Sequence, residues 1–288
     1  MFSILMVSLN PGDKLVETMK SVINQSYRDY EVVVKDGLSR DGSLGALRAY
    51  LDEQGCQDRV RILEQPDTSI YDGMNQATQA ARGEYLYFLN CGDAFASDQA
   101  LAQAAEEIGR SAGQGTEPGK GQEASPEPGQ DSCPRIFYGD IYDALRGQVV
   151  ASNPHMDDFA CYRNVPCHQA CIYHHSLFAE RGYEPGYRVR ADYEHFLWCY
   201  FCGNARPQYI PVTLASYEGG GFSETPENRK RSAREHREIT ALYMGTGQRL
   251  KYRLILLATL APLRTKMAES PIWSEFYNKC KKRLYRRR

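Results

Sequence analysis

Short apolar runs and amphipathic segments alternate over the first hundred residues. The apolar runs have the length of buried strands and lie at residues 2–9, 30–34, 60–64 and 84–89. The segments between them carry apolar residues at helical spacing and lie at residues 14–24, 43–54 and 70–81. Strands that are apolar throughout and alternate with helices are typical of a parallel sheet covered on both faces. We therefore predict an α/β fold with a mostly parallel, Rossmann-like sheet flanked by helices.

The second half of the chain is less regular. After a predicted helix at 99–108, residues 110–134 contain almost no apolar side chain, which indicates a flexible surface insertion within a loop. Beyond it the pattern predicts two strands, at 136–138 and 209–214, and two helices, at 192–202 and 229–244.

Polar side chains directly follow three of the predicted strands, at Asn10, Asp36 and Asp93. Ligands of open parallel sheets bind at the carboxyl ends of the strands. The Asp36 carboxylate could accept the N3–H of a uracil ring, or it could cap the loop that follows. Asp93, with Asn90 three residues earlier, could hold a divalent cation beside a diphosphate, or it could be the N-cap of the next helix.

A further carboxylate, Asp192, begins a predicted helix. It is either the N-cap of that helix or a general base for an acceptor hydroxyl, and Glu194 and His168 are the other candidates for a base. Arg190 could contact a phosphate group or pair with a neighbouring acid, and the same holds for Arg188.

Charge is distributed unevenly along a chain of formal net charge −1. Residues 249–288 contain twelve Lys and Arg and two acidic residues, so an acidic body carries a basic tail. The apolar run 254–263 in this tail suits an interfacial helix on an anionic membrane, or a core helix followed by a solvated end. Nucleic acid is disfavoured as a partner because the body is acidic and no nucleic-acid motif occurs. The nine Cys follow no disulfide framework, which favours the cytoplasm.

Four ordered motifs together resemble the family 2 glycosyltransferases, which have the GT-A fold. They are SLNPG at 8–12, DGLSRDGS at 36–43, EQPDTSIYDGMN at 64–75 and GEYLYFLNCGD at 83–93. The resemblance is closest to the bacterial branch that builds capsule, exopolysaccharide or lipopolysaccharide. It covers residues 1–223 apart from the insertion. We therefore expect a GT-A domain at 1–223 and a helical, basic, membrane-associating extension at 224–288.

The resemblance implies roles for residues that would bind a nucleotide-sugar donor. Asn10 follows the strand at which the family contacts the nucleoside, and Asp36 matches the acid that binds the base, usually uracil. Asp72 and Asn75 match a helix start that reaches toward the ribose and the sugar diphosphate. Asp93 falls at the motif that binds Mn²⁺ or Mg²⁺.

The family's reaction inverts the anomeric carbon, and Asp192 matches its catalytic base. His168 and Gln169 lie where such enzymes approach the acceptor, although a structural histidine is the alternative. The usual Asp-x-Asp metal motif is here replaced by Asn90 and Gly92 followed by Asp93, which makes a weaker cage.

These residues lead to one function and one alternative. We expect an inverting transferase that moves a sugar, usually UDP-linked, to a glycan or a polyprenyl-diphosphate-linked acceptor at the cytoplasmic face of the inner membrane. The Gln-x-x-Arg-Trp motif of processive members is absent, which indicates single additions. Residues 219–223 are candidates for a lid. A nucleotide-sugar-binding module without turnover is the alternative, motivated by the altered metal motif.

Overall fold

The first half of the chain forms the expected parallel strands. The computed structural model describes residues 1–113, 133–219, 225–259, 276 and 279–280. The strands β1 (Phe2–Ser8), β2 (Tyr30–Asp36), β3 (Val60–Glu64) and β4 (Tyr85–Phe88) pair in parallel in the order β3-β2-β1-β4. Their carboxyl ends therefore meet at one edge, as the polar residues after the apolar runs predicted.

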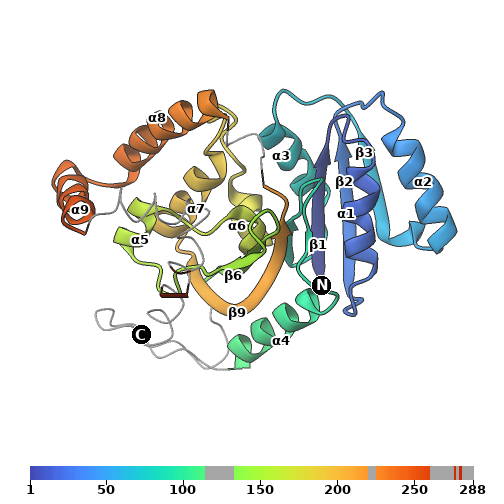
Figure 1. Cartoon of the computed structure of the whole chain (residues 1–288), viewed down its shortest axis with the longest axis horizontal. Helices are drawn as coiled ribbons and strands as arrows, with labels where there is room; N and C mark the ends of the chain where they lie inside the picture. The colour runs from blue at the N-terminus through green and yellow to red at the C-terminus, as the bar shows by residue number, and fades with distance from the viewer. Residues whose placement is uncertain (114–132, 220–224, 260–275, 277–278, 281–288) are drawn as a thin grey trace.

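The second half extends the same sheet with mixed pairing. β8 (Cys171–His174) pairs antiparallel with β4 and with β6 (Arg135–Asp143). β9 (Arg206–Tyr217) runs parallel to β6. Two short strands pair antiparallel, β5 (Ala94–Phe95) with β9 and β7 (Gln148–Val150) with β6. Figure 1 shows that β9 is strongly curved. The register shifts next to Gly139, where an added Cβ would lie 2.2 Å from the Val212 carbonyl oxygen, so this contact requires glycine.

Helices cover both faces of the sheet because successive strand residues point to opposite sides. Ile4 and Met6 pack in one core with α1 (Lys14–Ile23), α2 (Ser43–Gln54) and α4 (Ala100–Gly113). Leu5 and Val7 pack in the other core with α3 (Ile70–Ala80), α6 (His175–Glu180) and α7 (Ala191–Phe201). The α/β fold class is thus confirmed.

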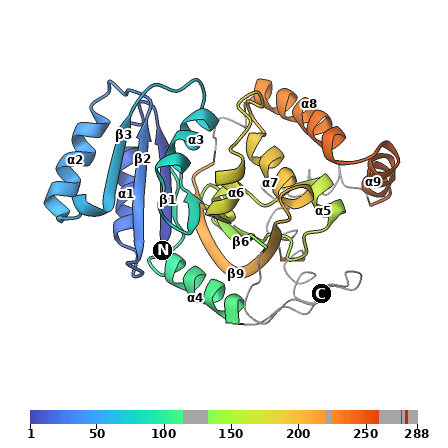
Figure 2. The ribbon, with the colours of Figure 1, turned by 180° about the vertical axis from the view of Figure 1, so that it is seen from behind.

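Three further helices lie beyond the sheet, at the end of the molecule opposite α2 (Figure 2). α8 (Pro226–Tyr243) packs on α7, and α9 (Thr246–Ala258) packs on α8 and on α5 (Asp158–Arg163). Within the described part of the chain, no helix has both the length and the apolar character needed to span a bilayer.

Some expected boundaries differ from those of the structure. α4 continues to Gly113, so residues 110–113 are helical and not part of a loop insertion. β9 is longer than the expected 209–214 because its pairing with β6 continues to Tyr217. The rest of the insertion (114–132), residues 220–223 of the expected lid, and most of the tail after 259 lie outside the described residues.

Candidate functional site

A cavity of 320 Å³ opens where β4 ends, beside the starts of α3 and α7 and the end of β9. Seven residues singled out from the sequence line it, namely Asn90, Asp93, His168, Gln169, Arg188, Asp192 and Gly219 of the expected lid. The sheet explains the meeting of the first four, because β4 and β8 are neighbours. Asn90 and Asp93 follow β4, and the 3₁₀ turn His168–Ala170 immediately precedes β8.

Asp93 is a buried carboxylate, with 6% of its surface exposed. Its Oδ2 accepts a hydrogen bond from Gln169 Nε2 at 2.8 Å, and its Oδ1 accepts one from the Glu218 backbone N–H at 3.2 Å. Burial raises the pKa of Asp93 above its ordinary value, and these two hydrogen bonds offset the rise only in part. The charge of Asp93 is therefore only partly compensated by the protein.

His168 lies between Asn90 and Asp192. Asn90 Nδ2 is 2.9 Å from His168 Nε2, and His168 Nδ1 is 3.6 Å from Asp192 Oδ2. With the amide donating to Nε2, the ring carries its proton on Nδ1 and directs it toward Asp192. The histidine thus connects the end of β4 to the start of α7.

Asp192 is fixed through one carboxylate oxygen. Its Oδ1 accepts a hydrogen bond from the Tyr193 N–H at 2.8 Å and lies 3.1 Å from the Tyr71 hydroxyl, which is also 2.9 Å from the Val189 carbonyl oxygen. Burial by itself would raise the pKa of Asp192, but His168, the Tyr193 N–H and Tyr71 together lower it below its ordinary value. Asp192 is therefore ionised at neutral pH, and Oδ2 is the oxygen that can take a proton.

The oxygen atoms near Asp93 fit a divalent cation that is held mainly by its substrate. Asn90 Oδ1 is buried and has no hydrogen-bond partner in the described part of the chain. The described residues contain no group of three or more His, Cys, Asp or Glu side chains that could hold a metal ion together. Mg²⁺ and similar ions often bind through one or two carboxylates plus substrate phosphates. One carboxylate and one amide oxygen are sufficient for that kind of site.

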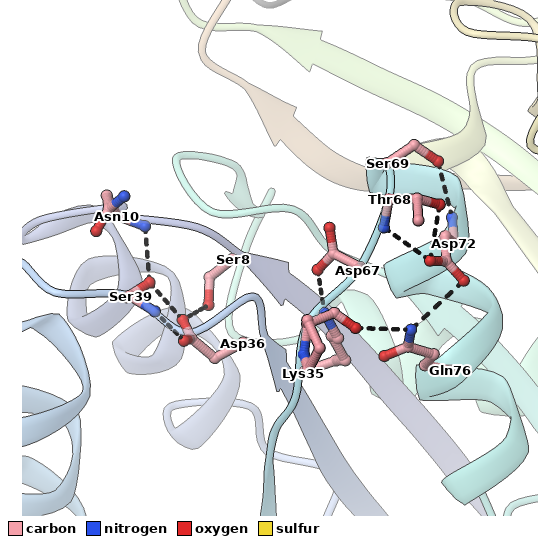
Figure 3. Close-up of polar contacts among 11 residues, drawn as sticks. Ser8, Asn10, Lys35, Asp36, Ser39, Asp67, Thr68, Ser69, Asp72 and Gln76 are labelled. Carbon is pink, nitrogen blue, oxygen red and sulfur yellow. Dashed lines mark hydrogen bonds and ion pairs between the residues drawn. The ribbon is translucent and has the colours of Figure 1, made fainter.

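Asn10 and Asp36 form a separate network at the ends of β1 and β2 and do not line the cavity (Figure 3). Asp36 is fully buried, and its carboxylate accepts hydrogen bonds from the Ser8 hydroxyl at 2.8 Å and from the Ser39 N–H and hydroxyl at 2.6 Å. The Asn10 side chain accepts the Arg40 N–H at 2.8 Å. In this conformation both residues order the loop after β2.

The other expected residues also have partners within the protein. Asp72 accepts bonds from the Thr68 N–H and hydroxyl at the start of α3, as Figure 3 shows. Asn75 exchanges two hydrogen bonds with the Tyr183 backbone, at 2.7 and 2.8 Å. Arg190 Nε donates to Ser232 Oγ at 2.7 Å and does not line the cavity, whereas Arg188 does.

Among the residues of the cavity that gave no functional signal in the sequence are four with charged or hydroxyl-bearing side chains, namely Lys14, Tyr71, Tyr217 and Glu218. Lys14 Nζ pairs with Glu218 Oε2 at 2.5 Å, across 204 residues of sequence. Tyr71 belongs to the motif at 64–75, in which the resemblance implied roles for Asp72 and Asn75. Its place in the cavity wall and its contact with Asp192 identify Tyr71 as part of the site.

Known proteins similar in sequence carry out glycosyl transfer. Residues 3–132 match the model of the family described as glycosyl transferase family 2. The PGL/p-HBAD biosynthesis glycosyltransferase of Mycobacterium tuberculosis is 30% identical over 227 residues, which cover 78% of this chain and 80% of the relative.

Solved structures are similar in fold over most of the chain. TarS from S. aureus (residues 1–349, in complex with UDP-GlcNAc) has a TM-score of 0.61 at 16% identity, over 87% of this chain and 70% of that one. The mannosyltransferase PcManGT from Pyrobaculum calidifontis, in complex with GDP-Man and Mn²⁺, has a TM-score of 0.61 at 13% identity, over 96% and 82%. These likenesses confirm the expected GT-A fold.

Proposed function

Because the chain belongs to family 2 of the glycosyltransferases, we propose that it transfers a sugar, with inversion, from a UDP-sugar to a hydroxyl of a glycan or lipid-linked acceptor. One observation carries the proposal: a partly compensated carboxylate, Asp93, and an ionised carboxylate, Asp192, line the same cavity. The first suits the donor diphosphate with its cation, and the second suits a base for the acceptor.

Asp192 would remove the proton from the acceptor hydroxyl as that oxygen attacks the anomeric carbon. Its Oδ2 would receive the proton, because Oδ1 is already occupied by Tyr193 and Tyr71. His168 would hold the carboxylate in position through Nδ1, and with Gln169 it would flank the acceptor. Attack on the face opposite the leaving group inverts the sugar.

Asp93 and Asn90 Oδ1 would hold Mn²⁺ or Mg²⁺ together with the donor diphosphate. When bound, this cation supplies positive charge that stabilises the departing diphosphate. Arg188 is exposed at the cavity, and no partner of its side chain is found among the described residues, so it would add a second positive charge there.

The donor's nucleoside would lie beyond the cavity, near Asn10 and Asp36, with Asp72 and Asn75 toward the ribose and the sugar diphosphate. This placement requires the fully buried Asp36 carboxylate to become accessible to the N3–H of uracil, for which Oδ1 has acceptor capacity left beside its bond from the Ser39 N–H. The solved TarS complex with UDP-GlcNAc supports the choice of a UDP-sugar. GDP-mannose is the competing donor, because PcManGT was solved with it.

We place the enzyme in the synthesis of bacterial surface polysaccharide, at the cytoplasmic face of the inner membrane. Residues 1–223 would form the catalytic domain and 224–288 a basic extension. The sequence motifs of the bacterial branch support this placement. A module that binds nucleotide-sugars without turnover is the second candidate, because the metal motif has a single carboxylate.

Donor and cation can be tested together by thermal denaturation. We expect a UDP-sugar to raise the melting temperature with Mn²⁺ and much less without it, because a ligand at a hundred times its Kd stabilises by about 2.7 kcal/mol. A larger shift of the melting temperature with GDP-mannose would indicate that the donor carries GDP and not UDP.

The base is tested by replacing Asp192→Asn. We expect transfer to fall by at least about a thousandfold while the donor-induced thermal shift is retained. Asp98→Asn, an exposed carboxylate outside the cavity, is the matched control and should leave transfer unchanged. Full activity of the Asp192 variant would remove this residue from the mechanism. Donor binding without transfer or hydrolysis in the unmodified protein would favour the binding module.

A further inference from the structure

A second concavity, of 530 Å³, lies between α5, α8 and α9, apart from the cavity described above. Its lining residues are Tyr162, His236, Arg237, Thr240, Thr246, Arg249, Leu250 and Arg253. Three of these side chains carry a permanent positive charge and none is a carboxylate. The concavity is therefore a basic site without an acidic counterpart in its wall.

The three guanidinium groups are available to a ligand. Within the described ranges, Arg237, Arg249 and Arg253 form no ion pair, although Arg231 and Arg234 on the same α8 do. Arg249 Nε is buried and has no hydrogen-bond partner there, and its Nη2 makes one long contact of 3.4 Å with Thr246 Oγ1. A buried N–H donor without an acceptor is costly, which favours a turn of the Arg249 side chain that would pair this donor with an anion in the concavity.

The helix that supplies two of these arginines also exposes a row of leucines. Leu250, Leu254 and Leu257 are 57%, 57% and 56% exposed, and their spacing places them on one side of α9. α9 contains three basic residues and no acid. It is held to α5 by Tyr252, which contacts the Phe159 and Tyr162 rings, so these leucines are not needed to fix the helix.

We propose that the concavity binds the phosphate group of an anionic phospholipid and that the leucines of α9 enter the bilayer interface beside it. Basic residues next to exposed leucines on one helix are the combination that binds anionic membrane surfaces. Leu250 belongs to both features, because it lines the concavity and begins the exposed row. A nucleic acid would use the arginines but gives no reason for the leucines.

The concavity between α5, α8 and α9 adjoins α7, the helix that carries Asp192. The His236 ring stacks on the Tyr193 ring at 5.2 Å between centroids, and Tyr193 follows Asp192 in α7. Burial lowers the pKa of His236, so its ring is neutral and the arginines supply the charge. Binding of the membrane at this concavity does not depend on the donor or on sugar transfer, and it can be measured without either.

The test is co-sedimentation of the full chain with vesicles of phosphatidylcholine alone or mixed equally with phosphatidylglycerol. The variant Arg237→Gln/Arg249→Gln/Arg253→Gln is compared with Arg229→Gln/Lys230→Gln/Arg234→Gln, which removes the same charge from α8 outside the concavity. In the first variant we expect binding to the mixed vesicles to weaken about a hundredfold, because each arginine contributes about fivefold. In the second variant we expect the binding to weaken less than about fivefold. The basic tail is unchanged in both.

A second pair of variants tests the apolar contact. Leu254→Gln should weaken binding to the mixed vesicles about tenfold, whereas Leu145→Gln, which is 72% exposed on the β6–β7 turn, should not. Circular dichroism and melting temperature show that each variant is folded. Equal losses in the matched variants, equal binding to neutral vesicles, or arginine-dependent binding of inorganic phosphate or single-stranded RNA without vesicle binding would each overturn the proposal.

Discussion

Glu235 on α8 accepts the backbone N–H of Val189 at 3.0 Å and so links α8 to the segment that precedes Asp192. The same carboxylate accepts the N–H groups of Arg188 and Arg190, at 3.1 and 2.9 Å, and is 2% exposed. Three consecutive N–H groups immediately before α7 are thereby satisfied by one side chain from a distant helix. The position of the proposed base thus depends on α8.

The variant Glu235→Ala should lower the free energy of unfolding by about 3 kcal/mol, because it leaves buried N–H groups without acceptors. Urea unfolding measures this loss. Glu238→Ala on the exposed side of α8 removes only a surface pair with Arg234 and should cost less than about 1 kcal/mol. Equal stability of the two variants would show that the Glu235 bonds contribute nothing net.

A buried ion pair joins the end of β2 to the segment before α3. Lys35 is fully buried, and its ammonium contacts Asp67 Oδ2, whose side chain is 11% exposed (Figure 3). Asp67→Ala should destabilise the protein by about 3–5 kcal/mol, because it leaves a buried charge unpaired. The exposed pair Arg48–Glu64 is the control, and Glu64→Ala should cost less than about 1 kcal/mol in chemical denaturation. A small loss at Asp67 would mean that water reaches Lys35.

Asp93→Asn should separate stability from activity. The folded-state pKa of Asp93 is raised by burial, so its contribution to stability is greatest below its unfolded pKa and is lost as the pH rises through the folded value. The variant should therefore melt higher than the unmodified protein at pH 7 and gain nothing below about pH 4.

Transfer by Asp93→Asn should fall by at least about a hundredfold, with the loss of the Mn²⁺-dependent thermal shift by the donor. Melting curves measured across pH test the expected gain in stability, and transfer assays with Mn²⁺ test the expected loss of activity. A lower melting temperature at pH 7 would show that the hydrogen bonds from Gln169 and Glu218 outweigh the cost of burying the charge.

Tyr71→Phe should alter the pH profile of transfer. The Tyr71 hydroxyl helps to lower the pKa of Asp192, so its loss should move the acidic limb of the kcat profile to higher pH and reduce kcat about tenfold. Tyr183→Phe is a close control, because its buried hydroxyl has no hydrogen-bond partner in the described chain and its ring lies 5.4 Å from that of Tyr71. An identical shift in both variants would assign the effect to packing.

Much of the site could be predicted because it follows strand ends and motif positions. Asn90 and Asp93 follow a buried strand directly, and Asp192 begins a helix, so local pattern and family motif indicated all three. Tyr71 and Lys14 could not be predicted in the same way. Their relevance depends on partners 121 and 204 residues away, at Asp192 and Glu218.

The sequence by itself determined the α/β class, the parallel character of the first four strands and the candidate carboxylates, because apolar periodicity and strand-end polarity are local properties. Only the tertiary structure decided which of those residues share a cavity. In the folded chain Gln169 donates a hydrogen bond to Asp93, and His168 lies next to Asp192. The Asp36 carboxylate accepts hydrogen bonds from Ser8 and Ser39. The reason is physical: a side chain's chemistry depends on the burial and the hydrogen-bond partners that distant segments supply.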